Sequence, residues 1–185
     1  MNALILKQTR MRRVSKLMSW LLFACAFGMV EAVCVVYLRQ MLGITGDYRD
    51  FASSKGLRLT THTISDLLDQ HGLLNIERVR ELATILLLAG ASWSTGKSVK
   101  ERYGLFAISF AAWDLSYYLF LKLLTGFPGD LMDTDIYFLI PVDWYGPVWF
   151  PVLVAMPAIM AAGLALIRKQ PKPIPNPAPF FRGLA

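Results

Sequence analysis

Residues 17–38 read LMSWLLFACAFGMVEAVCVVYL, an apolar run of 22 residues in which Glu31 is the only charged side chain. As an α-helix the run is about 33 Å long, which is enough to cross the roughly 30 Å hydrocarbon core of a bilayer. It is also too long for the apolar core of a secretory signal peptide, which has about 7–15 residues. The run therefore predicts a retained transmembrane helix in an integral membrane protein.

The composition of the whole chain agrees with a membrane location. Of its 185 residues, 55% are hydrophobic and 17% are charged, whereas a soluble domain has about 25% charged residues. The mean hydropathy is +0.45. The net charge of +6 comes from basic clusters beside the apolar runs and not from a basic face of a soluble fold. No nucleic-acid partner is therefore indicated.

Three further segments are predicted to cross the membrane, at about 75–95, 103–125 and 147–167. Residues 75–95 fit least well, because the apolar core Leu82–Trp93 has 12 residues and a crossing needs about 20. A re-entrant or interfacial helix is the alternative for this segment. In the last segment, Pro157 predicts a kink, because proline removes a backbone donor inside the helix.

The distribution of charge predicts the orientation. Four crossings place 12 of the 19 Lys and Arg residues on the side of both termini, together with only one of the 13 acidic residues, Glu101. The positive-inside rule makes that side the cytoplasm. We therefore expect a multi-pass protein of a bacterial-type cytoplasmic (inner) membrane. It would have a basic cytoplasmic tail at 1–16, a membrane domain at 17–168 and a proline-rich cytoplasmic tail at 169–185.

The connections between the crossings are predicted to lie at the outer surface. The capping box Thr63-Ile-Ser-Asp66 predicts a short helix over Ile64–Gln70, with its apolar side resting on the membrane. Residues 126–146 contain four aspartates and neither Lys nor Arg, which favours an outer interfacial loop or short helix. An aromatic belt is expected there, formed by Tyr137, Phe138, Trp144, Tyr145 and Trp149. The predicted fold class is thus all-α, a membrane bundle of four transmembrane helices with a short outer-surface helix and this loop.

Three acidic residues are predicted to lie at a similar depth on different helices. Glu31, Glu81 and Asp114 are about 16–21 Å from the cytoplasmic edge at 1.5 Å per residue. Because a charge at the centre of a membrane helix costs about 2.5–3.5 kcal/mol, such residues usually face the interior of a bundle. Ala24 and Gly28 share a face with Glu31, and small residues of this kind predict close helix packing.

These acids predict a buried polar pocket that opens toward the outside. Its expected residues are Glu31, Glu81, Asp114, Tyr118, Lys122 and Arg78. The alternative is a set of internal salt bridges with a structural role only. Carboxylates without histidine fit a zinc or di-iron site poorly, so neither a metal site nor a cofactor is indicated. No catalytic residue is assigned.

The pattern favours an accessory or binding subunit of a membrane complex, which would have the lipid bilayer and other membrane proteins or a second copy as partners. A small proton- or cation-handling transporter that uses Glu31, Glu81 and Asp114 is one alternative. An intramembrane enzyme that acts on a lipid or quinone is another, with Asp114 as its acid or base. The sequence leaves open whether the protein is an enzyme.

Overall fold

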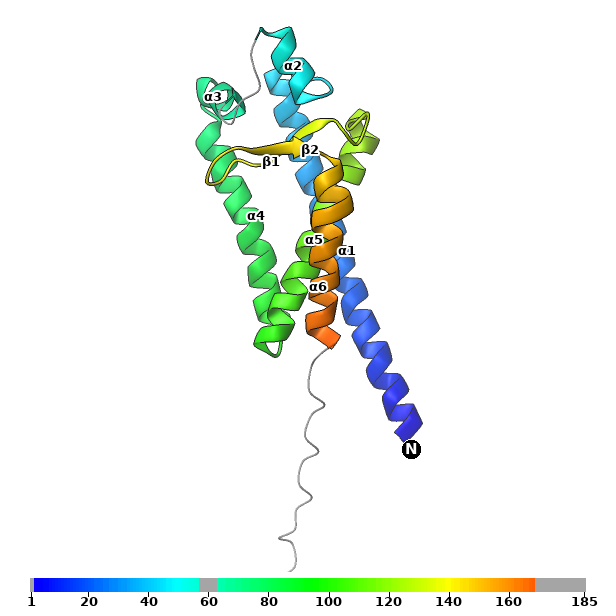
Figure 1. The fold of residues 1–185 in the computed structure, drawn as a ribbon. Helices are drawn as coiled ribbons and strands as arrows, with labels where there is room; N and C mark the ends of the chain where they lie inside the picture. Colours follow the sequence, from blue (N-terminus) through cyan, green and yellow to red (C-terminus); the bar gives the residue numbers. More distant parts are fainter. Residues whose placement is uncertain (1, 57–62, 169–185) are drawn as a thin grey trace, which may run out of the picture.

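The computed structural model describes residues 2–56 and 63–168, and most of these are helical (Figure 1). The elements are α1 (Asn2–Leu42), α2 (Tyr48–Ser54), α3 (Thr63–Gln70), α4 (Leu74–Thr95), α5 (Val99–Thr125), β1 (Thr134–Phe138), β2 (Trp144–Pro147), the π-helical η1 (Phe150–Ala155) and α6 (Met156–Arg168). The predicted proline-rich tail at 169–185 lies outside the described residues.

Three helical segments in the described part of the chain are long and apolar enough to cross a membrane. They are Val14–Leu42, Val99–Thr125 and Phe150–Arg168, and they mark the chain as a membrane protein. Helix α4 is not among them, since the charges of Glu77, Arg78, Arg80 and Glu81 lower the hydropathy of its first half. Three of the four predicted crossings are therefore supported by length and composition.

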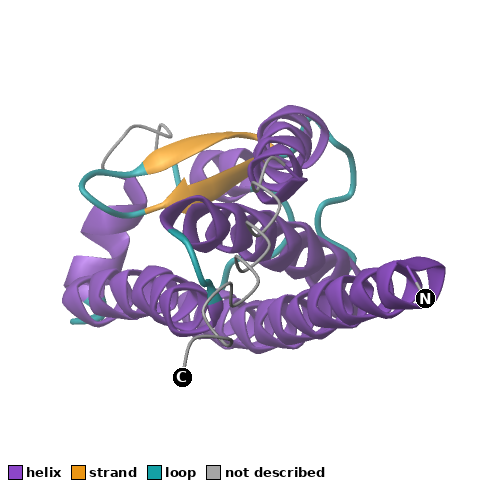
Figure 2. Ribbon diagram, turned by 90° about the horizontal axis from the view of Figure 1, so that it is seen from below, coloured by secondary structure: helices purple, strands orange, loops and turns teal. Residues whose placement is uncertain are grey.

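The two ends of the helical bundle differ in structure. The start of α1, the turn between α4 and α5, and the end of α6 lie at one end, here called the tail end (Figure 1). The helices α2 and α3 and the β1–β2 hairpin lie at the other, here called the hairpin end (Figure 1). Figure 2, which looks from below, shows the helices packed side by side with the hairpin across them. The hairpin end holds the candidate site.

Glycines let the helices approach closely. A Cβ at Gly28 of α1 would lie 2.6 Å from the carbonyl oxygen of Trp113 on α5, and a Cβ at Gly163 of α6 would lie 2.8 Å from that of Gly104. Both distances are shorter than van der Waals contact. The close packing predicted from the face that carries Gly28 is confirmed.

The helical turn just before Pro157 is π-helical, and in it the Met156 N–H bonds to the carbonyl oxygen of Pro151. Helix kinks usually occur at proline or at π-helical turns of this kind.

The all-α prediction is wrong in one region, because residues 134–147 form an antiparallel hairpin. Thr134 pairs with Pro147, and Phe138 pairs with Trp144 after an irregularity in the register. The β-branched and aromatic residues of β1 favour an extended chain. The sequence instead predicts a short helix or loop for the apolar stretch up to Pro141.

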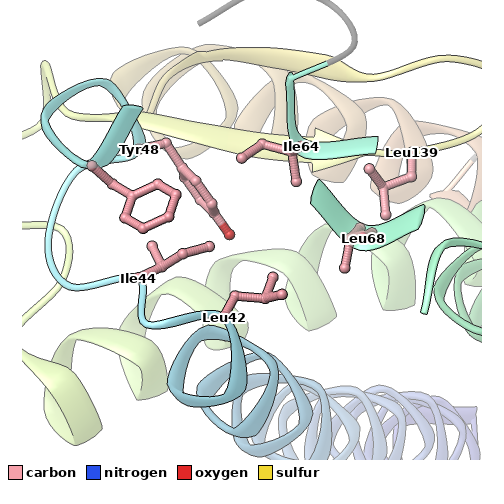
Figure 3. Close-up of a cluster of buried hydrophobic side chains, with 7 residues drawn as sticks. Leu42, Ile44, Tyr48, Ile64, Leu68 and Leu139 are labelled. Atoms are coloured by element: carbon pink, nitrogen blue, oxygen red, sulfur yellow. The ribbon is translucent and has the colours of Figure 1, made fainter. Parts of the chain in front are cut away.

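A hydrophobic cluster closes the hairpin end (Figure 3). It consists of Leu42, Ile44, Tyr48, Phe51, Ile64, Leu68 and Leu139. Two of its members, Ile64 and Leu68, belong to α3. The apolar side of this helix therefore packs against protein, whereas the sequence predicts that it rests on the membrane. Asp143 fixes the start of α3, since its carboxylate accepts hydrogen bonds from the backbone N–H of Ser65 at 3.1 Å and from the Ser65 hydroxyl.

Candidate functional site

A cavity of about 60 Å³ lies beneath the hairpin, among α1, α3, α4, α5 and β1. At about 30 Å³ of liquid volume per water, this volume corresponds to about two water molecules. The ionisable residues in its wall are Glu31, Glu77, Arg80, Glu81 and Asp114, together with the tyrosines Tyr48, Tyr117, Tyr118 and Tyr137. Trp113, Phe138 and several aliphatic side chains complete the wall. The cavity is thus a polar space with aromatic sides.

Arg80 is the only basic residue in the wall among the described residues, and two of the four acids bind it. Its Nε donates to Glu77 Oε2 at 2.7 Å, and its Nη1 forms an ion pair with Glu31 Oε1. The Thr84 hydroxyl lies 3.5 Å from the second oxygen of Glu31. These contacts join α1 to α4 and pair the guanidinium of Arg80 with two carboxylates.

Glu81 holds the hairpin onto α4. Both of its carboxylate oxygens accept from the backbone N–H of Leu139, at 3.1 and 2.9 Å. Arg78, three residues earlier on α4, donates through Nε to the carbonyl oxygen of the same Leu139 at 3.3 Å. The two side chains therefore clamp one peptide segment of the hairpin, and Glu81 has no cationic partner among the described residues.

Two adjacent residues of α5 bring unsatisfied polar atoms to the cavity wall. Asp114 Oδ2 and Trp113 Nε1 are buried, and neither has a hydrogen-bond partner in the described part of the chain. The Trp113 side chain is well buried, since the residue is 5% exposed, and its ring packs against Phe138 with centroids 6.4 Å apart. Buried polar groups are nearly always hydrogen-bonded, so these two atoms point to water or a ligand as partner.

A second buried charge pair lies next to the cavity. Arg39 and Asp135 are 4% and 1% exposed, and Nη1 lies 4.0 Å from Oδ1. The guanidinium of Arg39 sits over the rings of Tyr48 and Phe127, 4.7 and 4.2 Å from their centroids, and donates to the carbonyl oxygen of Gly46. The pair anchors the start of the hairpin to the end of α1.

Burial raises the pKa of Asp135 to about 6, although the charge of Arg39 and hydrogen bonds from the Ile136 N–H and the hydroxyls of Tyr118 and Tyr117 lower it. Burial also raises the pKa of Tyr48 to about 12. The hydroxyls of Tyr117 and Tyr118 connect Asp135 to helix α5, which also carries Asp114.

Four of the six residues predicted for the pocket line this cavity, namely Glu31, Glu81, Asp114 and Tyr118. Arg78 and Lys122 do not. Arg78 binds the hairpin backbone as described above, and Lys122 Nζ donates to the carbonyl oxygens of Gly126 at 2.9 Å and Pro128 at 2.5 Å. Lysine often binds the free carbonyl groups at the C-terminus of a helix, and this use keeps Lys122 away from the carboxylates.

Sequence reasoning leaves Glu77 and Arg80 out of the site and does not predict the buried Asp135 beside it. Glu77 and Arg80 are three positions apart on α4, a spacing that predicts an ion pair on one helix face, and this signal was present in the sequence. Asp135 lies in a segment predicted to be a loop, so nothing in the pattern indicated that it is buried.

No group of three or more His, Cys, Asp or Glu residues within 2–56 and 63–168 is placed to hold a metal ion. Comparison of the chain with protein-family models, with curated proteins and with solved structures found no match.

Proposed function

We propose that the protein is a small polytopic membrane protein that binds a small polar ligand in the cavity beneath its hairpin, as a binding or accessory subunit of a membrane complex. The observation that carries this proposal is the pair of unpartnered atoms, Asp114 Oδ2 and Trp113 Nε1, at the wall of one cavity. A purely structural charge network would have its buried charges paired, since an unpaired buried charge is costly. Here Asp114 forms no ion pair with any described residue.

The proposal includes a fourth crossing by α4 and an outward-facing hairpin end. Helix α4 has 22 residues, which span about 33 Å, and it packs against α5. The ion pairs of Arg80 with Glu31 and Glu77 lower the cost of its charges within a bilayer. With both termini in the cytoplasm of a bacterial-type cell, the basic clusters at 7–16 and 97–102 lie inside, as the positive-inside rule favours.

Binding is better supported than transport, because apolar packing closes the bundle on the tail side of the cavity. Leu88 lies one helical turn beyond Thr84 on α4 and is 0% exposed, packed in a cluster with Ala24, Ala112 and Trp113. A transport path would have to pass through this core. The cavity therefore resembles a binding site with access from one end.

Cysteine reactivity tests the proposal, with both natural cysteines replaced by alanine. Thr84→Cys places a thiol at the cavity wall, and Leu88→Cys places one in the dry core on the same helix face. Methyl methanethiosulfonate, a small neutral reagent, reacts with the thiolate and so requires local water. We expect modification of Thr84→Cys at least tenfold faster than of Leu88→Cys. Equal, slow rates would mean a dry, closed cavity and would contradict the proposal.

The same cysteine-free background tests the orientation. In intact cells, a membrane-impermeant maleimide should label Ser53→Cys on α2 and Met132→Cys before β1, since both positions are exposed. Val99→Cys at the tail end is 61% exposed in the native residue and should react only after the cells are permeabilised. Labelling of Val99→Cys in intact cells would overturn the four-crossing arrangement.

A further inference from the structure

We propose that the ligand of this cavity is a small primary ammonium ion that also carries an oxygen acceptor, the chemistry of ethanolamine. This inference rests on the proposed binding function and names the class of ligand. The ammonium group would bind Asp114, and the oxygen would accept from the indole N–H of Trp113.

Charge selects a cation. The described residues give the cavity wall four carboxylates and one guanidinium, and that guanidinium is engaged by Glu31 and Glu77. Asp114 forms no ion pair with a described residue, so an anion would be repelled and a neutral ligand would leave this carboxylate unpaired. A buried carboxylate is stabilised when a positive charge with N–H donors lies against it.

Hydrogen bonding selects an organic cation over a metal ion. Asp114 Oδ2 needs a donor, whereas Trp113 Nε1 is a donor and needs an acceptor. A bare metal ion cannot accept from the indole. The oxygens of Glu31, Glu77 and Glu81 already accept from Arg80 and from the Leu139 backbone, which leaves too few free ligands for a hard cation.

Geometry limits the size and the degree of substitution of the amine. A cavity of about 60 Å³ has the volume of about two liquid water molecules, which limits the ligand to a few non-hydrogen atoms, and ethanolamine has four. A quaternary ammonium has no N–H to give to Asp114. The rings of Trp113, Tyr117, Tyr118 and Phe138 in the wall favour a cation through their negative faces.

The experiment measures ethanolamine binding by calorimetry to the full-length protein in nanodiscs of phosphatidylcholine, which has no primary amine. We expect saturable binding to the wild-type protein, at least tenfold weaker binding to Asp114→Asn, and weakened binding to Trp113→Phe. Asp130→Asn is the matched control, because it removes one exposed hairpin-end carboxylate away from the cavity, and it should bind like the wild type. Tetramethylammonium should not compete.

Two sources of the same chemistry, a free amine and a lipid headgroup, are distinguished by the nanodisc lipid. If phosphatidylethanolamine in the disc weakens the binding of free ethanolamine, the headgroup occupies the site. If it has no effect, the ligand is the free amine. Both results support the proposed chemistry.

Absence of saturable ethanolamine binding to the wild-type protein, or equal binding to Asp114→Asn, would overturn the inference. Because a variant can also fail to fold, ethanolamine should in addition slow the modification of Thr84→Cys, which needs no change at Asp114. If ethanolamine neither binds nor slows the modification, but Thr84→Cys still reacts with the reagent, only the proposed ligand class is rejected. An unreactive Thr84→Cys rejects the binding function itself.

Discussion

Asp135 shows how one residue can connect the hairpin to the membrane helices at a cost in stability. Its carboxylate is 1% exposed, receives hydrogen bonds from Tyr117 and Tyr118, and faces Arg39 at 4.0 Å. One of its oxygens and one nitrogen of Arg39 have no partner among the described residues. A buried ion pair with unsatisfied atoms repays its desolvation poorly, so protonation of Asp135 should stabilise the fold.

The pH dependence of stability follows from the pKa of Asp135. An aspartate in the unfolded chain titrates near pH 3.8 and Asp135 in the folded protein near 6, so between these values the folded protein holds a proton that the unfolded chain has lost. The stability of the wild type relative to Asp135→Asn should therefore fall as the pH rises from 4 to 6, by up to about 3 kcal/mol, and then stay constant. Thermal unfolding of both proteins in detergent at several pH values measures this difference.

Asp130→Asn provides the reference for this series, because Asp130 is exposed and its substitution should give no such trend. A relative stability of the wild type that rises with pH would show that Arg39 holds Asp135 ionised more strongly than burial disfavours the charge.

At the scale of the elements, the contact between α1 and α5 depends on a missing side chain. A Cβ at Gly28 would lie 2.1 Å from Ser116 Oγ and 2.6 Å from the Trp113 carbonyl oxygen, whereas a Cβ at Gly90 of α4 would have nothing within 4 Å. Gly28→Ala should therefore destabilise the protein by about 1–3 kcal/mol through overpacking. Gly90→Ala should be neutral or stabilise it by up to about 1 kcal/mol. Thermal unfolding in detergent compares the two variants.

If Gly28→Ala melts at the same temperature as the wild type, the two helices are not in the close contact described here. Since Trp113 belongs to both this contact and the cavity, the cavity geometry would then also need revision.

The helices were more predictable than the connections for a physical reason. Long apolar runs such as 17–38 are read directly from hydropathy, and small residues such as Gly28 indicate where helices meet. Helix α4 was harder to predict, because it mixes apolar and charged residues. Its charged side chains bind partners on other elements, since Arg80 pairs with Glu31 on α1 and Glu81 accepts from Leu139 in the hairpin. Such long-range partners leave no local signal, and for the same reason the β hairpin was missed.

The candidate site was predictable only in its acidic part. Because burying a charge in lipid is costly, the sequence predicts that Glu31, Glu81 and Asp114 lie together inside the bundle. All three line the cavity. The basic partner was not predictable in the same way, because several cations lay at similar depth. The choice of Arg80 over Lys122 depends on side-chain reach and on the carbonyl groups at the end of α5, which appear only in the folded structure.

At the scale of the whole molecule, the polar contacts that position the hairpin surround the cavity. Glu81 and Arg78 hold Leu139, and Asp143 holds Ser65 of α3. Asp47, which caps α2, accepts from the Thr134 N–H at 3.1 Å. The hairpin and the two short helices thus cover the hairpin end of the bundle (Figure 1), while many large hydrophobic side chains of α1, α4 and α5 are exposed on its sides.

The most direct test of the central claim is a crystal structure of the full chain grown from a lipid mesophase, at a resolution that shows water. The account predicts that Asp114 Oδ2 and Trp113 Nε1 both contact ordered water or a bound small molecule in a cavity that Arg80, Glu31 and Glu81 also line. The claim would be contradicted by an Asp114 carboxylate paired with an arginine or lysine, or facing lipid, with the space beneath the hairpin filled by side chains.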